Sequence, residues 1–128
     1  MPFVEDTIPK LYDELEVLQG AIAQSALDYK TLANEYANAV CDYEDAKGKT
    51  ILLLKAEEDA TPGLKRTESV REAIYRTEHA DLRRKRTELG EAVRAEKVFL
   101  DALANQLTAT QTRIRLIEFQ ERGQVNER

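Results

Sequence analysis

Apolar residues recur every seven positions along the first half of the chain. One row consists of Leu15, Ile22, Tyr29, Tyr36 and Tyr43, and a second row, three residues further on, of Leu18, Ser25, Leu32, Ala39 and Ala46. Two rows offset in this way are the a and d positions of a coiled-coil heptad, with polar residues between them. The pattern predicts one long helix from about residue 8 to about residue 59, capped by Thr7, with Pro9 in its first turn.

The second half of the chain carries the same repeat. Its rows are Leu89, Glu96, Leu103, Thr110 and Ile117, and Val93, Leu100, Leu107 and Ile114. Ser69 followed by Glu72 has the spacing of a capping box, which marks the start of a helix. These features predict a second helix from about residue 68 to about residue 121, ended by Gly123 and followed by a frayed C-terminal tail.

The two predicted helices are separated by the only Pro-Gly pair in the chain, Pro62-Gly63. Because Pro-Gly is a strong breaker, it predicts a connector over about residues 60–67. A short connector makes its two helices antiparallel neighbours, so residue i pairs with roughly residue 126 − i. Tyr36 then lies opposite Gly90. Tyr29 lies near Glu96, where its hydroxyl could donate a hydrogen bond to the carboxylate.

The predicted fold class is therefore all-α, a long antiparallel helical hairpin that resembles a coiled coil and forms a single domain over residues 1–128. Apolar runs such as 51–54 and 114–119 extend beyond the heptad rows. A helix that is apolar on more than one side needs a second neighbour. This predicts a homo-oligomer with an interface formed by Leu52, Leu54, Phe99, Leu116 and Phe119. In the alternative, the helices break and fold into a compact monomeric bundle with these residues inside.

The composition argues against several classes of protein. With 3 prolines, 5 glycines and 34% charged residues, the chain lacks the frequent turns of an all-β sandwich. One cysteine and one histidine argue against a disulfide framework and a zinc site. No apolar stretch reaches the length of about 18 residues that a membrane span requires. The N-terminal sequence MPFVEDTIPK lacks the basic and apolar regions of a secretory signal, so we expect a cytoplasmic protein.

Residues that could support catalysis are scarce. We expect His79, in RTEHAD, to be a solvated surface residue and Cys41 to be a small buried thiol. The sequence has no phosphate-binding glycine loop of the P-loop type. We therefore expect no enzymatic activity, no catalytic residue, no cofactor, no metal site and no small-molecule substrate.

Basic residues gather in the second half of the chain. Residues 1–63 hold 5 Lys/Arg and 13 Asp/Glu, whereas residues 64–128 hold 14 and 11. Clusters of cations bind nucleic acid by neutralising its phosphates. The candidate nucleic-acid-binding residues are Lys55, Lys65, Arg66, Arg71, Arg83, Arg84, Lys85 and Arg86. In the alternative, these cations pair with neighbouring carboxylates such as Glu68 and Glu72 and stay solvated. Tyr12 and Tyr75 lie off the heptad rows and are expected to be freer to contact a ligand.

Three segments carry a resemblance to a known family. They are LLLKAEED at the end of the first predicted helix, GLKRTESVREA after it, and LTATQTRIRLIEF near the end of the second. Over roughly residues 26–118 this layout resembles the UvsY-type recombination mediators of the T-even bacteriophages. The resemblance implies a ring-like oligomer of helical hairpins that binds single-stranded DNA. It also implies that the oligomer helps to load a RecA-like recombinase onto DNA coated by a single-strand-binding protein. The family's DNA-contacting positions match Lys55, Lys65, Arg66 and Arg71.

The sequence thus favours a non-enzymatic, oligomeric accessory protein of phage recombination or replication, acting in the host cytoplasm. Its expected partners are further copies of itself, single-stranded DNA, a recombinase and a single-strand-binding protein, with no membrane partner. The alternative is a phage structural or assembly coiled coil, such as a scaffold, tail or capsid-associated protein, that binds protein partners only. A small regulator that docks onto a host enzyme is a third possibility.

Overall fold

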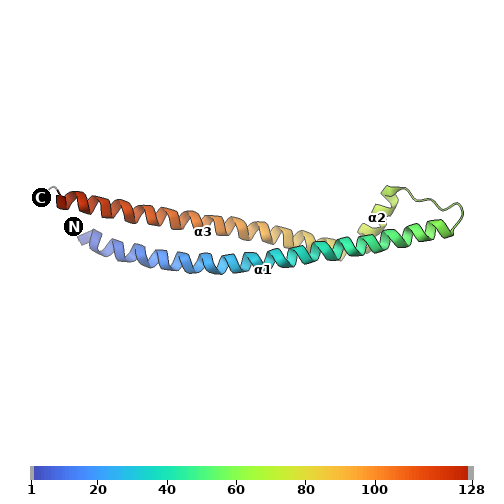
Figure 1. Cartoon of the computed structure of the whole chain (residues 1–128), viewed down its shortest axis with the longest axis horizontal. Helices are drawn as coiled ribbons and strands as arrows, with labels where there is room; N and C mark the ends of the chain where they lie inside the picture. The colour runs from blue at the N-terminus through green and yellow to red at the C-terminus, as the bar shows by residue number, and fades with distance from the viewer. Residues whose placement is uncertain (1, 127–128) are drawn as a thin grey trace. The chain divides into compact units, whose positions relative to one another are not determined.

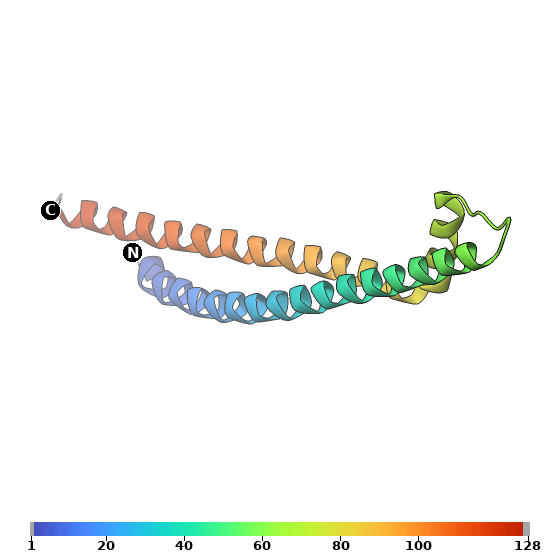
Figure 2. The same ribbon diagram turned by 45° about the vertical axis from the view of Figure 1, so that its right-hand side comes forward.

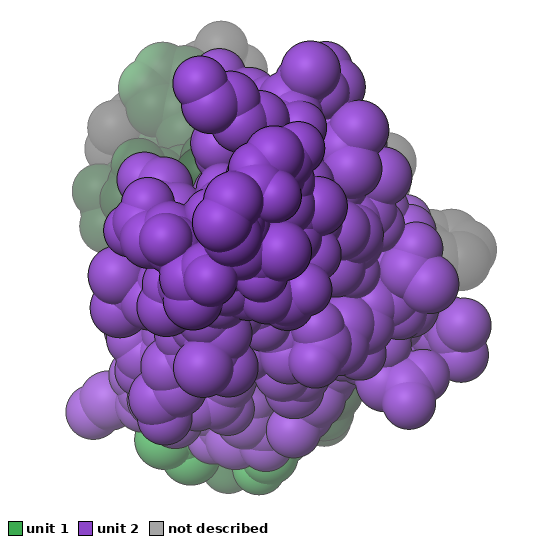
Figure 3. Space-filling view, turned by 90° about the vertical axis from the view of Figure 1, so that its right-hand side faces the viewer, with its two compact units in different colours: residues 1–29, 95–128 green, residues 30–94 purple. Residues whose placement is uncertain are grey.

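The computed structural model describes residues 2–126, which form helices α1 (Pro2–Ala60), α2 (Glu68–Glu78) and α3 (Ala80–Asn126) (Figure 1). Over these residues there is no β-strand, so the all-α prediction is confirmed. The chain divides into two compact units, coloured separately in Figure 3. Unit 1 comprises residues 1–29 and 95–128, and unit 2 comprises residues 30–94. Within each unit, α1 packs antiparallel against α3, as the hairpin prediction requires.

The predicted heptad rows form the contact between α1 and α3. All residues of these rows, which we call the heptad seam, are buried or half-buried. In unit 1 the row of Leu18 extends one heptad further back to Leu11, which is also buried. None of the described helices has the length and apolar character needed to cross a lipid bilayer.

Polar residues on the heptad seam of unit 1 are satisfied across the helix pair. Ser25, which is buried, donates from Oγ to Glu96 Oε1 at 2.6 Å. The expected donor to Glu96 was Tyr29, and the structure assigns this role to Ser25, one helical turn earlier. The shorter serine side chain fits beside the carboxylate inside the seam. Nearer the chain ends, Tyr12 Oη donates to Glu118 Oε1 at 3.0 Å.

In unit 2, the predicted pairing of Tyr36 with Gly90 is confirmed. A Cβ atom built on Gly90 would lie 3.0 Å from Tyr36 Cε2. Gly90 is buried, so the missing side chain provides the space into which the tyrosine ring packs. Both Gly48 and Gly90 lie inside uninterrupted helices.

The second predicted helix is divided at His79, which the sequence pattern did not indicate. His79 has φ −111° and ψ 31°, outside helical values, and ends α2. Its N–H donates to Tyr75 O (2.9 Å) and its C=O accepts from Arg83 N–H (3.0 Å). In both ribbon views α2 leaves the line of α3 at this junction (Figures 1 and 2).

The expectation that His79 is a solvated residue is wrong. Its ring nitrogen Nε2 shares a 2.6 Å hydrogen bond with Oγ1 of Thr50, which is buried on α1. Proline, glycine and inserted polar groups are the usual causes of a sharp helix kink. The segment RTEHAD contains neither proline nor glycine, and we attribute the bend to this contact with α1.

The ends of the helices differ from the expected positions in three places. First, α1 begins at Pro2, which suits proline at the first helical position, so Thr7 and Pro9 lie inside the helix. Second, the cap of α2 is Thr67, whose side chain accepts from Val70 N–H at 3.3 Å, and no Ser69–Glu72 capping box forms. Glu72 pairs instead with Arg76.

Third, α3 continues through Gly123 to Asn126. Among the described glycines only Gly63 has a positive φ, and the left-handed conformation is what makes a glycine end a helix. Of the expected frayed tail, residues 125–126 are helical and residues 127–128 lie outside the described residues.

The connector turns at the predicted Pro-Gly pair. Leu64 N–H donates to Thr61 O at 3.2 Å, and Gly63 has φ +83°. Proline at the second position and a positive φ at the third define a type II turn, where glycine is strongly preferred. The break between residues 60 and 67 is therefore confirmed, with the turn at its start.

Replacing Gly63 should destabilise the chain through backbone conformation alone. A Cβ atom at Gly63 meets nothing within 4 Å, so Gly63→Ala should lower the free energy of unfolding by about 1 kcal/mol because of the positive φ. Gly48 also has free space around it but is helical, so Gly48→Ala should raise that free energy by about 0.5–1 kcal/mol. Urea denaturation measures both. Equal stabilisation by the two substitutions would contradict the turn.

Candidate nucleic-acid interface

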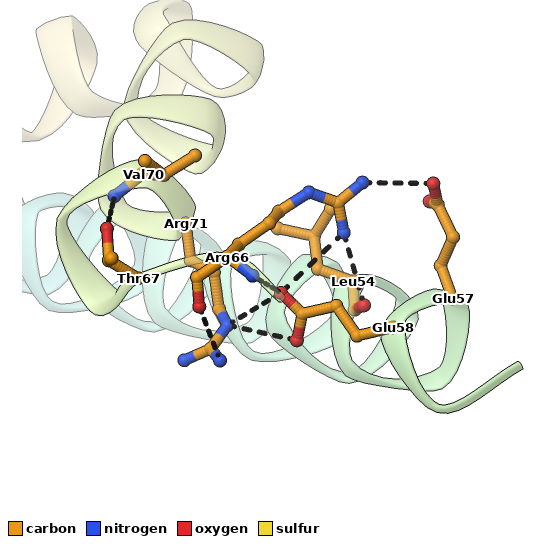
Figure 4. A network of polar contacts seen from close by, with 7 residues as sticks. All are labelled: Leu54, Glu57, Glu58, Arg66, Thr67, Val70 and Arg71. Atoms are coloured by element: carbon orange, nitrogen blue, oxygen red, sulfur yellow. Dashed lines mark hydrogen bonds and ion pairs between the residues drawn. The ribbon is translucent and has the colours of Figure 1, made fainter. Parts of the chain in front are cut away.

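Two of the candidate DNA-contacting arginines are bonded within the protein (Figure 4). Arg66 Nη2 lies 2.9 Å from Glu57 Oε1, and Arg66 Nη1 donates to Leu54 O at 3.3 Å. Arg71 Nε donates to both carboxylate oxygens of Glu58, at 3.2 and 3.3 Å, and its Nη2 donates to Arg66 O at 3.0 Å. These bonds hold the connector and the start of α2 against the last turns of α1.

Glu58 is the centre of this network. Its side chain is 10% exposed, and its Oε1 also accepts from Arg66 N–H at 3.0 Å. Burial raises the pKa of the Glu58 carboxyl, but the hydrogen bonds from Arg71 and Arg66 and their positive charges outweigh burial, so the pKa lies below its ordinary value. A phosphate at Arg66 or Arg71 would have to compete with these carboxylates.

The other two candidates near the connector, Lys55 and Lys65, are exposed. Neither forms an ion pair with a residue of the described chain. The structure therefore separates the four cations around the connector into two structural arginines and two solvated lysines.

The basic run at the start of α3 is more accessible. Arg83, Arg84 and Lys85 are exposed, and Arg86 is half-buried. Arg84 lies 3.8 Å from Asp81, a long and solvent-exposed pair of a kind that contributes little. Arg83, Arg84 and Arg86 line one pocket of about 420 Å³ together with Ala80 and Thr87. The run thus brings three of its four cations to one surface.

A second pocket of unit 2, of about 370 Å³, is more polar and draws on all of its helices. It is lined by Tyr43, Glu44, Lys47, Glu72, Tyr75, Arg76, Arg83 and Arg86. Two of its cations lie over aromatic rings, Arg86 at 4.4 Å from the Tyr43 centroid and Lys47 at 5.1 Å from that of Tyr75. We call this space the three-helix pocket.

Two ion pairs lie inside the three-helix pocket. Arg76 Nη2 is 2.6 Å from Glu72 Oε1, and Arg86 Nη1 is 3.8 Å from Glu44 Oε1. The alternative raised by the sequence, pairing of cations with nearby carboxylates, therefore applies to part of the cluster.

The candidate residues predicted from the sequence include neither Arg76 nor Lys47, and Tyr75 was expected to be free to contact a ligand. Tyr75 is in fact only 8% exposed and belongs to the core. The predicted antiparallel register could have indicated that Lys47 belongs to the site, because it places Lys47 opposite residue 79, one turn from both Tyr75 and Arg83. Tyr75 lies on α2, whose tilt away from α3 was not expected.

The tyrosines of the heptad seam serve packing. Tyr43 is 4% exposed, and Tyr29 and Tyr36 are half-buried. Cations cover the rings of Tyr43 and Tyr75, so these rings offer no open face for stacking a base. Tyr12 is exposed, and its hydrogen bond to the Glu118 carboxylate raises the pKa of its hydroxyl. Cys41, expected to be a buried thiol, is exposed.

The residues proposed for an oligomer interface are mostly on the surface. Leu52, Phe99, Leu116 and Phe119 are exposed, whereas Leu54 is half-buried. Leu52 belongs to unit 2, and the other three exposed residues belong to unit 1. Within residues 2–126, no three His, Cys, Asp or Glu side chains converge as metal ligands would.

Compared with protein-family models, curated proteins and solved structures, the chain matches none of them.

The ionised Glu58 carboxylate should stabilise the connector in a pH-dependent way. The pKa of the Glu58 carboxyl is lower in the folded protein than in the unfolded chain, so the carboxylate stabilises the fold at pH values above its unfolded-state pKa. This stabilisation is lost as the pH falls through the folded-state pKa. Glu58→Gln should therefore lower the urea midpoint at about pH 7, with a difference from wild type that shrinks towards about pH 3.

The matched control for this experiment is Glu57→Gln, because Glu57 is 56% exposed and, among the described residues, forms an ion pair with Arg66 alone. Its effect should be smaller at every pH. A difference between wild type and Glu58→Gln that stays constant across the pH range would contradict the assignment of Glu58 as the centre of the network.

Proposed function

We propose that this chain is a non-enzymatic accessory protein of recombination or replication that binds single-stranded DNA through cations of unit 2. The observation that carries the proposal is the exposed run Arg83, Arg84 and Lys85 beside two pockets lined by arginine. Between residues 65 and 86 the chain holds 8 Lys/Arg and 4 Asp/Glu. This is the one long stretch of unit 2 in which positive charge prevails.

The local charge favours unit 2 over unit 1 as the binding surface. Unit 2 holds 13 Lys/Arg and 13 Asp/Glu, whereas unit 1 holds 6 and 11. The net charge of −5 thus belongs to unit 1. Lys55 and Lys65 add two solvated cations to unit 2, while Arg66 and Arg71 shape the connector that carries Lys65.

The binding would be electrostatic and largely independent of sequence. Lysine and arginine side chains release condensed counterions when they neutralise backbone phosphates. No open aromatic ring is available at the three-helix pocket to stack bases, so phosphate contacts would dominate. The layout similar to the UvsY-type mediators supports single-stranded DNA as the substrate. A role beside a RecA-like recombinase and a single-strand-binding protein follows from the same resemblance.

Salt-dependent binding tests this function. Fluorescence anisotropy with labelled oligo-dT should show binding at about 50 mM salt that weakens steeply by about 200 mM. Combined Arg83→Ala, Arg84→Ala and Lys85→Ala should reduce the salt slope by about 2, since each lost contact to a single strand removes about 0.7. The control combines Lys97→Ala, Arg113→Ala and Arg115→Ala, three exposed cations of unit 1. Absence of binding at low salt would overturn the proposal.

A homo-oligomer is the second part of the proposal, and the exposed apolar side chains support it. Leu116 and Phe119 lie one helical turn apart on α3, and both are more than half exposed. Large apolar side chains that lie together and are exposed to solvent are typical of an interaction surface. Assembly would also repeat the cations of unit 2 in each copy. An oligomer that fails to bind DNA would favour the alternative function, a structural or assembly coiled coil.

Light scattering tests the oligomer. The wild-type chain should have a mass above 14.6 kDa at micromolar concentration. Combined Leu116→Gln and Phe119→Gln should lower that mass towards the monomer. Leu27→Gln changes an exposed leucine of α1 outside the proposed interface and should leave the mass unchanged. A wild-type mass of 14.6 kDa would refute assembly.

A further inference from the structure

We propose that the three-helix pocket is a phosphate-binding site that anchors one backbone phosphate of the bound strand. The inference deepens the proposed function and rests on it for the identity of the natural ligand. The pocket itself follows from observations that do not depend on DNA. These are its unpaired cations, its tyrosine hydroxyls and its construction from three helices.

The pocket has more positive than negative side chains, and its carboxylates are already engaged. Four cations and two carboxylates line it. Glu72 pairs with Arg76 and Glu44 with Arg86. Lys47 and Arg83 have no carboxylate partner among the residues that the structure describes. An anion in the pocket would therefore meet two cations that no internal ion pair neutralises.

The two tyrosines supply hydrogen-bond donors that the protein does not use. Tyr43 and Tyr75 are 4% and 8% exposed, yet neither hydroxyl has a hydrogen-bond partner within residues 2–126. No fully buried side-chain oxygen of the described chain lacks a partner, so each hydroxyl must reach solvent. The three-helix pocket is a solvent-filled space that both residues line. The hydroxyls of Tyr43 and Tyr75 therefore remain available as donors to a ligand that enters the pocket.

A phosphate group matches this set of donors. A backbone phosphate carries one negative charge and two unesterified oxygens, which can accept from an arginine fork, an ammonium group and phenolic hydroxyls together. A volume of about 370 Å³ accommodates the phosphate with part of its hydration shell. Because Lys47 and Arg86 cover the tyrosine rings, the pocket offers contacts to phosphate and none to a stacked base.

The ligand would link all three helices of unit 2. Tyr43 and Lys47 come from α1, Tyr75 and Arg76 from α2, and Arg83 from α3. The last two helices meet at the His79 junction, so a bound phosphate would bridge this kink. Because such a ligand binds the folded arrangement and not the unfolded chain, it should stabilise unit 2.

Two probes test the pocket on the full chain. Inorganic pyrophosphate, followed by calorimetry and by the rise in melting temperature, reports on the pocket alone, and oligo-dT anisotropy reports on the strand. Lys47→Ala should weaken pyrophosphate binding by about tenfold or more, since hydrogen bonds to charged groups are the stronger ones. Tyr75→Phe keeps the ring and its packing, and should weaken pyrophosphate binding by about fivefold. Both variants should also weaken oligo-dT binding, and Lys47→Ala should do so more than Tyr75→Phe.

Matched controls are Lys49→Ala and Tyr12→Phe, which change an exposed lysine two residues away and a tyrosine of unit 1. Both should bind the two probes as the wild type does. The pocket proposal is overturned if pyrophosphate does not bind. It is also overturned if Lys47→Ala and Tyr75→Phe bind both probes like wild type. In either case, binding of oligo-dT by the exposed cations would still support the proposed function. If pyrophosphate binds in the predicted order and oligo-dT does not, the site is supported with a free polyphosphate as its ligand, and the proposed function fails.

Discussion

The antiparallel packing of the heptad seam is the constraint on which the other features depend. Inside each unit it fixes which residue of α1 faces which residue of α3. It therefore places Ser25 beside Glu96 in unit 1 and Tyr36 beside Gly90 in unit 2. A shift by one residue would move the apolar rows off the contact, bury charged side chains and drive the Tyr36 ring against a side chain in place of Gly90. The register is thus specified by packing and by satisfied polar groups together.

The same register decides which cations are available to a ligand. At the connector, Glu58 accepts hydrogen bonds from both Arg66 and Arg71, so these arginines stabilise the connector. Residues 76–86 hold 5 Lys/Arg and 2 Asp/Glu, and Lys47 and Arg83 line the same pocket from different helices. The proposed basic surface is therefore centred on residues 76–86, although the sequence also places four cations around the connector.

The sequence was sufficient for features that depend on local pattern. Heptad spacing gave the seam, and Pro62-Gly63 gave the turn, because only a narrow range of backbone angles fits that pair. The division at His79 was not predictable, since it depends on a contact with Thr50, 29 positions away, and not on a breaker residue. Thr67 replaced Ser69 as cap for a related reason. The connector, held by Arg66 and Arg71, sets where the chain enters α2, whereas the Ser69–Glu72 spacing favoured Ser69.

A chain with a net charge of −5 can still present a surface that attracts phosphate. Unit 2 itself holds equal numbers of Lys/Arg and Asp/Glu, 13 of each. At 0.1 M salt, those of its charges that lie more than about 10 Å from a bound phosphate are largely screened from it. Within unit 2, half-buried carboxylates such as Glu58 are neutralised by arginine at contact distance. A strand bound as proposed would meet the remaining cations at short range, because Lys47, Arg83 and Lys85 form no ion pair within the described chain. Local geometry, rather than total charge, determines whether an acidic protein of this kind can bind a polyanion.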